Sequence, residues 1–288
     1  MGIASVREGE RSIVGGEFPF TDRDFKQIAA MLYADAGLAL PESKATLVYS
    51  RLAKRLRALG LESFRQYCTL VSEAEGAGER RNMLAALTTN VTRFFREPHH
   101  FEHLKAEVLP RLLQSARRSG RVRLWSAGCS TGQEPYSIAL TVLSLMPDAA
   151  EFDVKILATD IDPNVLTAAR RGTYSQTEVS PIPAELARRW MIPREGGALE
   201  VGEAMRELVA FRELNLIGAW PMKGRFDAIF CRNVVIYFDE PTQHRMWGRF
   251  RGLLQPGGRL YVGHSERVTD DGFRTAGLTT YALAGGRA

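Results

Sequence analysis

Cysteine is scarce in this chain. Cys68, Cys129 and Cys231 are the only cysteines in 288 residues. An odd number at such wide spacings does not suit a disulfide framework, and unpaired thiols are typical of a reducing compartment. The cysteine content therefore predicts a cytoplasmic protein.

Long apolar runs are missing as well. No stretch reaches the roughly 20 apolar residues that a membrane-spanning helix needs, and the first residues lack the apolar core of a secretory signal. Residues 1–17 are rich in glycine, serine and charge without periodicity, which predicts a flexible lead-in. We expect a soluble protein that does not insert into a membrane.

Phosphate-binding signatures are also absent. Gly128 and Gly132 are spaced too widely for the G-x-G-x-x-G fingerprint, and no Lys-Ser/Thr pair follows as in a P-loop. Residues 124–137 nevertheless read as a buried strand, a small-residue turn and a helix start, an arrangement in which backbone approaches a nucleotide-like ligand. The segment predicts a ligand without a polyphosphate; an ordinary strand-to-helix turn is the alternative.

The five histidines, His99, His100, His103, His244 and His264, show no metal-ligand spacing supported by cysteines or carboxylates, which predicts no metal site. The net charge of +5 is mildly basic. It favours an acidic partner, although a well-solvated basic surface explains it equally well.

The pattern from Phe18 to about Thr89 is helical and predicts a small helical domain. Thr21 and Asp24 form a capping box, and Gly37 is a plausible C-terminal stop. The next helix has an apolar stripe closed by Gly60, formed by Leu47, Leu52, Leu56 and Leu59.

After a linking helix at 97–115, strands alternate with helices, which predicts a parallel sheet covered on both faces. The expected strands are 122–126, 154–159, 226–231 and 259–263, with helices near 134–145, 163–171 and 241–254. Residues 199–201 and 208–214 resemble two short strands joined through a polar turn at 202–207. We expect them to form an antiparallel insertion lying off the main sheet.

Polar residues follow two of the expected strands, where ligands bind in open α/β sheets. Asp160 suits the hydroxyls of a ribose, because an ionised carboxylate offers only acceptors. A helix cap is its alternative role, although Asp162, directly before Pro163, is the better cap. Arg232 and Asn233 end an apolar strand abruptly at the same edge.

Several blocks of this sequence resemble the CheR family, the S-adenosylmethionine (SAM)-dependent glutamate O-methyltransferases of bacterial chemotaxis receptors. The resemblance extends from Phe18 to Leu283 and rests on residues 89–97 (TNVTRFFRE), 130–137 (STGQEPYS), 159–162 (TDID), 230–238 (FCRNVVIYF), 256–258 (PGG) and 263–266 (GHSE). It implies an α/β fold: a Rossmann-like class I methyltransferase domain at 90–288 with a small antiparallel β-subdomain at about 195–214. An all-helical receptor-recognition domain at 18–89 precedes it.

The resemblance also implies site residues. The residues it implies for SAM, or for its product S-adenosylhomocysteine, are Asn90, Thr92, Arg96, Glu134, Asp160, Asn215, Leu216, Arg232 and Asn233. Arg96 and Tyr237 would lie beside the transferred methyl group as the catalytic residues. Many members have Glu where this chain has Gln133, a departure that affects only local detail.

The predicted second helix carries Arg51, Lys54, Arg55 and Arg57, mostly on one face. Such a run is usually a solvated face. The resemblance implies instead that it binds the cytoplasmic helical bundle of methyl-accepting receptors. The short connection at 191–197 favours recognition that does not depend on a receptor tail peptide.

Two other functions remain alternatives. A nucleic-acid methyltransferase would suit the basic charge, but the chain lacks an aromatic-flanked Pro-Pro motif and any RNA-binding signature. A receptor-binding module without catalysis would not need the polar set between Asn90 and Asn233. We expect a monomeric enzyme that does not bind nucleic acid.

Overall fold

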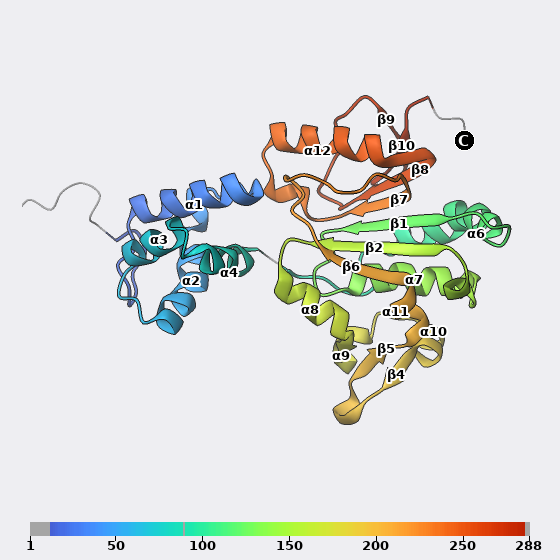
Figure 1. Ribbon diagram of the computed structural model, residues 1–288, viewed down its shortest axis with the longest axis horizontal. Helices are drawn as coiled ribbons and strands as arrows, with labels where there is room; N and C mark the ends of the chain where they lie inside the picture. The colour runs from blue at the N-terminus through green and yellow to red at the C-terminus, as the bar shows by residue number, and fades with distance from the viewer. Residues whose placement is uncertain (1–11, 89, 286–288) are drawn as a thin grey trace, which may run out of the picture. The chain divides into compact units, whose positions relative to one another are not determined.

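The computed structural model describes residues 12–88 and 90–285, which divide into two compact units (Figure 1). The N-terminal unit contains the residues before 90 together with Tyr237–Asp239, and the second unit contains Asn90–Ile236 and the residues from Glu240 onward. Hydrogen bonds connect the later segment to the N-terminal unit. The Ala39 amide donates to the Tyr237 carbonyl at 2.9 Å, and the Tyr33 hydroxyl donates to Asp239 at 2.7 Å.

The N-terminal unit is helical, as predicted. Its elements are α1 (Asp22–Ala36), the short η1 (Glu42–Lys44), α2 (Ala45–Leu59), α3 (Phe64–Ser72) and α4 (Ala77–Leu87). The predicted capping box of Thr21 and Asp24 is confirmed. Gly37 and Gly60 end α1 and α2 in the left-handed region, with φ of 70° and 67°, where glycine alone is unstrained.

The second unit is built on a seven-stranded sheet in the order β6-β2-β1-β7-β8-β10-β9. The first five strands run parallel, and the β9–β10 hairpin joins them antiparallel. Their bounds are β1 Val122–Ala127, β2 Val154–Asp160, β6 Val209–Glu213, β7 Phe226–Cys231, β8 Leu254–Val262, β9 Phe273–Gly277 and β10 Thr280–Leu283. The predicted strands at the positions of β1, β2 and β7 are confirmed.

Helices pack against this sheet. α7 (Gln133–Leu145) contacts β1, β2 and β6, α12 (Glu240–Leu253) contacts β8, and α8 (Pro163–Arg171) contacts β2 and β6. The predicted linking helix is one run of α5 (His99–His103), a π-helical turn η2 (Leu104–Val108) and α6 (Leu109–Ala116). The remaining short elements are η3 (Ala149–Glu151), α9 (Gln176–Val179), α10 (Ala184–Trp190), η4 (Glu195–Gly197) and η5 (Val235–Tyr237).

The expected antiparallel pairing of 199–201 with 208–214 is wrong. Residues 202–207, expected to be a turn, lie almost entirely in the helix α11 (Glu203–Leu208), and β6 pairs in parallel with β2 in the main sheet. Packing explains why β6 joins the main sheet. Val209 and Phe211 of β6 are buried, and the centroid of the Phe211 ring lies 5.6 Å from that of the Tyr136 ring in α7. The alternating pattern of a strand is the same in either sheet and does not identify its partner.

A small antiparallel sheet does exist, with different strands from those expected. Its order is β3-β5-β4, from Thr173–Tyr174, Leu199–Val201 and Met191–Pro193. It therefore spans 173–201 rather than 195–214. The segment at 191–197, expected to be only a short connection, contains the edge strand β4, so its shortness does not argue against a peptide site. Among the described residues, no helix is long and apolar enough to cross a membrane.

Replacing Thr21 tests the cap of α1. The Thr21 hydroxyl accepts from the Asp24 amide at 3.2 Å, and the Asp24 carboxylate accepts from the Thr21 amide at 2.9 Å. We expect Thr21→Ala to lower the free energy of unfolding by about 1 kcal/mol, measured by urea denaturation. Thr21→Ser keeps the hydroxyl and should be nearly neutral; an equal loss in both variants would contradict the cap.

Candidate active site

The strand order places the candidate site. The chain passes from β1 to β2 on one side and from β7 to β8 on the other, so the order reverses between β1 and β7. Ligands of open α/β sheets bind beyond the carboxyl ends of the strands at such a point. Glu134 in the first turn of α7 and Arg232 directly after β7 both lie there.

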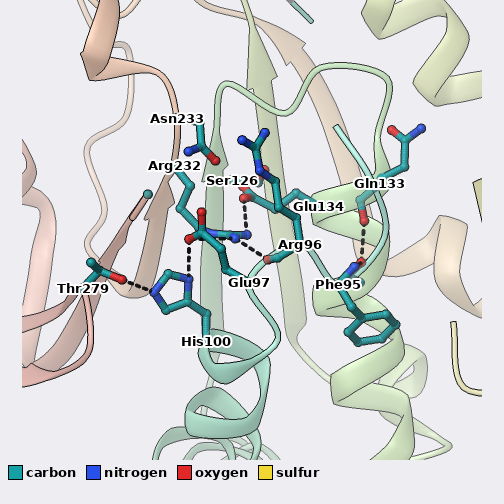
Figure 2. Close-up of polar contacts among 12 residues, drawn as sticks. Phe95, Arg96, Glu97, His100, Ser126, Gln133, Glu134, Arg232, Asn233 and Thr279 are labelled. Atoms are coloured by element: carbon teal, nitrogen blue, oxygen red, sulfur yellow. Dashed lines mark hydrogen bonds and ion pairs between the residues drawn. The ribbon is translucent and has the colours of Figure 1, made fainter. Parts of the chain in front are cut away.

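Arg232 is the centre of a buried charge cluster (Figure 2). Its side chain is only 2% exposed. Its Nη1 donates to Glu134 Oε2 at 3.0 Å, its Nη2 forms an ion pair with Glu97 Oε2 at 3.2 Å, and the Arg96 carbonyl accepts a further hydrogen bond from Nη2. Two carboxyl groups thus face one guanidinium.

The two carboxylates differ in environment. Burial opposes ionisation of Glu97, but Arg232 and His264 outweigh it and lower the pKa of Glu97 to about 2. Burial raises the pKa of Glu134, against the opposing effects of Arg232 and of the Ser126 hydroxyl, which donates to Glu134 Oε1 at 2.7 Å. Glu97 is therefore the firmly ionised partner of Arg232.

Strained backbone surrounds this cluster. Phe95, Glu97, Ser130 and Asn233 have φ of 50°, 58°, 48° and 60°, a region that non-glycine residues rarely adopt. Each such residue costs of order 1–3 kcal/mol and persists only where surrounding contacts enforce it. Four of them around one cluster are typical of a functional site.

Asp160 holds two loops by their backbone. One of its oxygens accepts from the Ser130 amide at 2.8 Å, and the other accepts from the Asp162 amide at 3.0 Å. Asp162 is the N-cap of α8 and accepts from the Asn164 amide at 2.8 Å. The prediction that Asp162 is the better cap is confirmed, and Asp160 joins the turn after β1 to the turn after β2.

The segment before α5 is irregular. Asn90 donates its side-chain amide to Asp162 at 3.1 Å, and the Ser130 hydroxyl donates to the Asn90 carbonyl at 2.8 Å. Arg96 is half-buried and donates to the Val91 carbonyl at 3.0 Å. Thr92 is also half-buried. Asn90 therefore belongs to the same set of contacts as Asp162 and the turn after β1.

Asn215 and Leu216 follow β6 beside an open pocket. The pocket is lined by Glu213, Leu214, Asn215, Ala219, Trp220 and Pro221. The Leu214 amide donates to the Asp160 carbonyl at 2.9 Å, which ties this loop to the end of β2. Arg249 of α12 lies 3.8 Å over the Trp220 ring and donates to the Leu216 carbonyl at 2.7 Å. The loop is thus held from two sides.

The contacts link predicted residues in two sets. Arg232 contacts Glu134 and the Arg96 carbonyl, whereas Asn90 and Asp160 are both hydrogen-bonded to Ser130. Tyr237 belongs to the N-terminal unit.

Three of the four predicted substrate-binding residues form hydrogen bonds or ion pairs with other residues of the N-terminal unit. Arg51 donates to the carbonyls of Ala86, Leu87 and Thr88. Arg55 forms a two-fold hydrogen-bonded pair with the buried Glu79, at 2.9 and 2.6 Å, and Arg57 pairs with Glu17 at 2.7 Å. Lys54 is exposed and has no ion pair within the described ranges.

One carboxylate–histidine cluster was not foreseen. Single ligand atoms of Glu97, His99 and His100 lie within 4.8 Å of one another. A cation there would face the Arg232 guanidinium, which already pairs with the Glu97 carboxylate at 3.2 Å, so the charges disfavour a metal. Burial, the largest cause, lowers the pKa of His100 to about 3, so this histidine is neutral at physiological pH.

The sequence reasoning missed Glu97 and Glu266 as residues of the site. Glu97 pairs with Arg232, and Glu266 accepts hydrogen bonds from the loop that contains Asn233. Both lie inside blocks that carry the family resemblance, so their place in those blocks was the available signal. Their partners are far away in the chain, and spacing alone could not show them.

Comparison with known proteins matches both units. Residues 90–282 match the family model described as CheR methyltransferase, SAM binding domain, and residues 23–88 match the model described as CheR methyltransferase, all-alpha domain. The probable chemotaxis protein methyltransferase of Rhizobium etli is 57% identical, over 87% of this chain and 96% of its own length. Chemotaxis protein methyltransferase 2 of Pseudomonas aeruginosa is 46% identical over 93% and 95%. The Escherichia coli chemotaxis protein methyltransferase is 41% identical over 92% of each.

The lowered pKa of Glu97 predicts a pH-dependent contribution to stability. A carboxyl group whose pKa falls on folding stabilises the protein above its unfolded value, near 4.5, and loses that contribution as pH falls toward its folded value of about 2. The difference in unfolding free energy between the wild type and Glu97→Gln should therefore shrink between these values. Chemical denaturation at several pH values measures it.

Glu102→Gln is the matched control, because Glu102 is exposed on the adjacent helix α5. Its difference from the wild type should stay small at every pH. A Glu97→Gln difference that does not change with pH would contradict the assignment.

Proposed function

Because the chain belongs to the CheR methyltransferase family, which methylates receptor glutamates with SAM, we propose that the polar cluster around Arg232 forms its cofactor and methyl-transfer site. The observation that carries this proposal is the buried Arg232 with its partners Glu97 and Glu134 at the point where the strand order reverses. A chemotaxis methyltransferase acts on chemoreceptors, and we place this one in the cytoplasm as a monomer that does not bind nucleic acid.

The residues of the site fit SAM. Arg232 Nε is buried and has no hydrogen-bond partner among the described residues, so it offers a donor to the carboxylate of the methionyl group. The excess of carboxylates around Arg232 suits the ammonium of the same group. Asp160 uses one lone pair of each oxygen on a backbone amide and keeps further acceptor capacity for ribose hydroxyls.

Other residues of the set complete the proposed binding site. Asn215 and Leu216 hold the adenine edge at the loop after β6, beside Trp220. Asn90 and Thr92 contribute from the segment before α5, and Asn233 contributes from the loop after β7. SAM, when bound, supplies an activated methyl group on a sulfonium.

The reaction needs no general base on the protein. A glutamate side chain has a pKa of about 4.3, so the receptor glutamate is already a carboxylate near neutral pH. The work of the protein is to hold that anion at a near-attack distance and to exclude water. We assign the Arg96 guanidinium to the acceptor carboxylate and the Tyr237 hydroxyl to the orientation of its reacting oxygen.

The receptor surface is proposed to lie on the N-terminal unit, which would serve as the receptor-recognition domain. Of the four predicted basic residues, Lys54 is the one whose side chain has no ion pair or hydrogen bond to any described residue. The acidic methylation sites of a helical receptor bundle would be attracted to this exposed cation, which raises the rate of encounter at low salt.

Transfer of labelled methyl groups tests the function. Incubation with labelled SAM and the cytoplasmic domain of a receptor should give base-labile label on glutamate residues, located by peptide mapping. Asp160→Ala should weaken S-adenosylhomocysteine binding by about 10- to 150-fold, as expected for loss of a charged acceptor worth roughly 1.5 to 3 kcal/mol. Label on nucleic acid would support the alternative substrate, and no cofactor binding would indicate a non-catalytic module.

A charge reversal tests the docking surface separately. Lys54→Glu should raise the KM for a receptor domain lacking its C-terminal tail several-fold, because the variant repels an acidic bundle, and it should leave cofactor affinity unchanged. Arg65→Glu makes the same charge change at an exposed position of α3 and serves as the control. Equal effects of the two variants, or none, would contradict a role for Lys54.

Arg55→Glu is unsuitable for that test. It would place a carboxylate beside Glu79, whose side chain is 8% exposed and also accepts from the Tyr67 hydroxyl at 2.9 Å. Leaving a buried charge unpaired destabilises a fold strongly. Its loss of activity would therefore report folding rather than docking.

A further inference from the structure

The segment Gly263–Glu266 follows β8, and its Glu266 is hydrogen-bonded to the loop after β7, which contains Asn233. No role for this segment follows from the contacts of the cofactor residues alone. It nevertheless touches the site at two separate points, through Glu266 and through His264.

Glu266 binds four backbone amides. Its Oε1 accepts from the amides of Val234 and Val235, both at 2.9 Å, and its Oε2 accepts from the Asn233 amide at 2.8 Å and from the Gly263 amide. The residue is 3% exposed. Three successive amides that point at one carboxylate form an anion-binding concavity of the backbone, here filled by a side chain of the protein itself.

This carboxylate accounts for the strained conformation of Asn233. The φ of Asn233 is 60°, a left-handed conformation that costs free energy. The hydrogen bonds that Glu266 accepts from the amides of residues 233–235 offset this cost. Burial raises the pKa of Glu266, while the amides oppose the rise because they can only donate. The loop therefore requires a group with acceptors on both oxygens.

Gly263 supports the same geometry by its lack of a side chain. A Cβ at this position would lie 2.5 Å from Asn233 Nδ2, 2.8 Å from the Asn233 amide nitrogen and 2.8 Å from Glu266 Oε2. Because real Cβ atoms are essentially never found so close to other atoms, any larger residue must displace Asn233 or Glu266. Only glycine allows this close approach of the two loops.

His264 reaches the other side of the cluster. Its ring Nδ1 lies 3.0 Å from Glu97 Oε1, and its amide donates to the same oxygen at 3.3 Å. Glu97 in turn pairs with Arg232 at 3.2 Å. The segment thus holds Asn233 directly and Arg232 through Glu97.

We propose that Glu266 is a positioning residue for the cofactor site, which acts by holding the backbone of residues 233–235 so that Arg232 and Asn233 face the cofactor. The inference deepens the proposed function, since it rests on the assignment of Arg232 and Asn233 to SAM. It adds a residue that does not itself touch the cofactor.

Binding of S-adenosylhomocysteine to the full chain, measured by titration calorimetry, tests the proposal. Glu266→Gln keeps the size of the side chain but replaces one acceptor oxygen by an amide NH2, which would face two backbone N–H donors. We expect its Kd to rise about tenfold or more, because two hydrogen bonds of the loop are lost. Thermal unfolding of the unliganded variant, followed in parallel, establishes that the titrated protein is folded.

Gly263→Ala provides an independent test without a change of charge. It should raise the Kd several-fold through the clash with Asn233, and the KM for SAM should rise with it while kcat does not increase. Gly252→Ala is the matched control, because a Cβ at Gly252 meets nothing within 4 Å, and its Kd should stay within about twofold of the wild type.

The outcomes separate this inference from the proposed function. If Glu266→Gln or Gly263→Ala folds and binds S-adenosylhomocysteine as the wild type does, the positioning role is wrong. If Glu266→Gln does not fold, Gly263→Ala against Gly252→Ala decides the question. If the wild type binds the cofactor product but methylates no receptor, and both variants lose that binding, the positioning role stands and the proposed substrate fails.

Discussion

The burial of the Arg232 guanidinium is the constraint on which the site depends. A charge taken out of water must be matched by opposite charges and hydrogen bonds, and Arg232 finds them in Glu134, Glu97 and the carbonyl of Arg96. These partners come from the first turn of α7 and from the segment before α5. Glu97, which forms an ion pair with Arg232, has a left-handed φ of 58°. The strain at this residue thus lies at a contact that the buried guanidinium needs.

Acidic side chains at this sheet edge form hydrogen bonds to backbone amides of the protein itself. Asp160 accepts from the amides of Ser130 and Asp162, and Glu266 accepts from three consecutive amides after β7. Each carboxylate thereby fixes the path of a loop that follows a strand. Since loops are otherwise the most mobile parts of a fold, these contacts hold the site in place before the cofactor arrives, and less binding energy is needed to order it.

Local signals in the sequence predicted local structure well. The capping box at Thr21 and the glycine ends of α1 and α2 depend on residues within one turn of each other, and the structure has them as expected. The error at 199–214 has the opposite origin. The apolar alternation around Val209 and Phe211 identified a strand correctly, but the sheet it joins depends on contacts with β2 and α7, more than 60 residues earlier in the case of α7.

In the candidate site, too, the local features could be predicted from the sequence and the contacts between distant residues could not. The sequence by itself determined that Asp160 ends one parallel strand and Arg232 follows another, which places both at the carboxyl edge of the sheet, because the strand pattern and the polar residues at its end are both local. Only the tertiary structure decided that Arg55 forms an ion pair with Glu79 while Lys54 stays exposed. It also decided that Glu97 pairs with Arg232 and that Glu266 binds the loop of Asn233. Each of these outcomes is a choice among partners distant in the chain, and packing brings those partners within hydrogen-bonding distance.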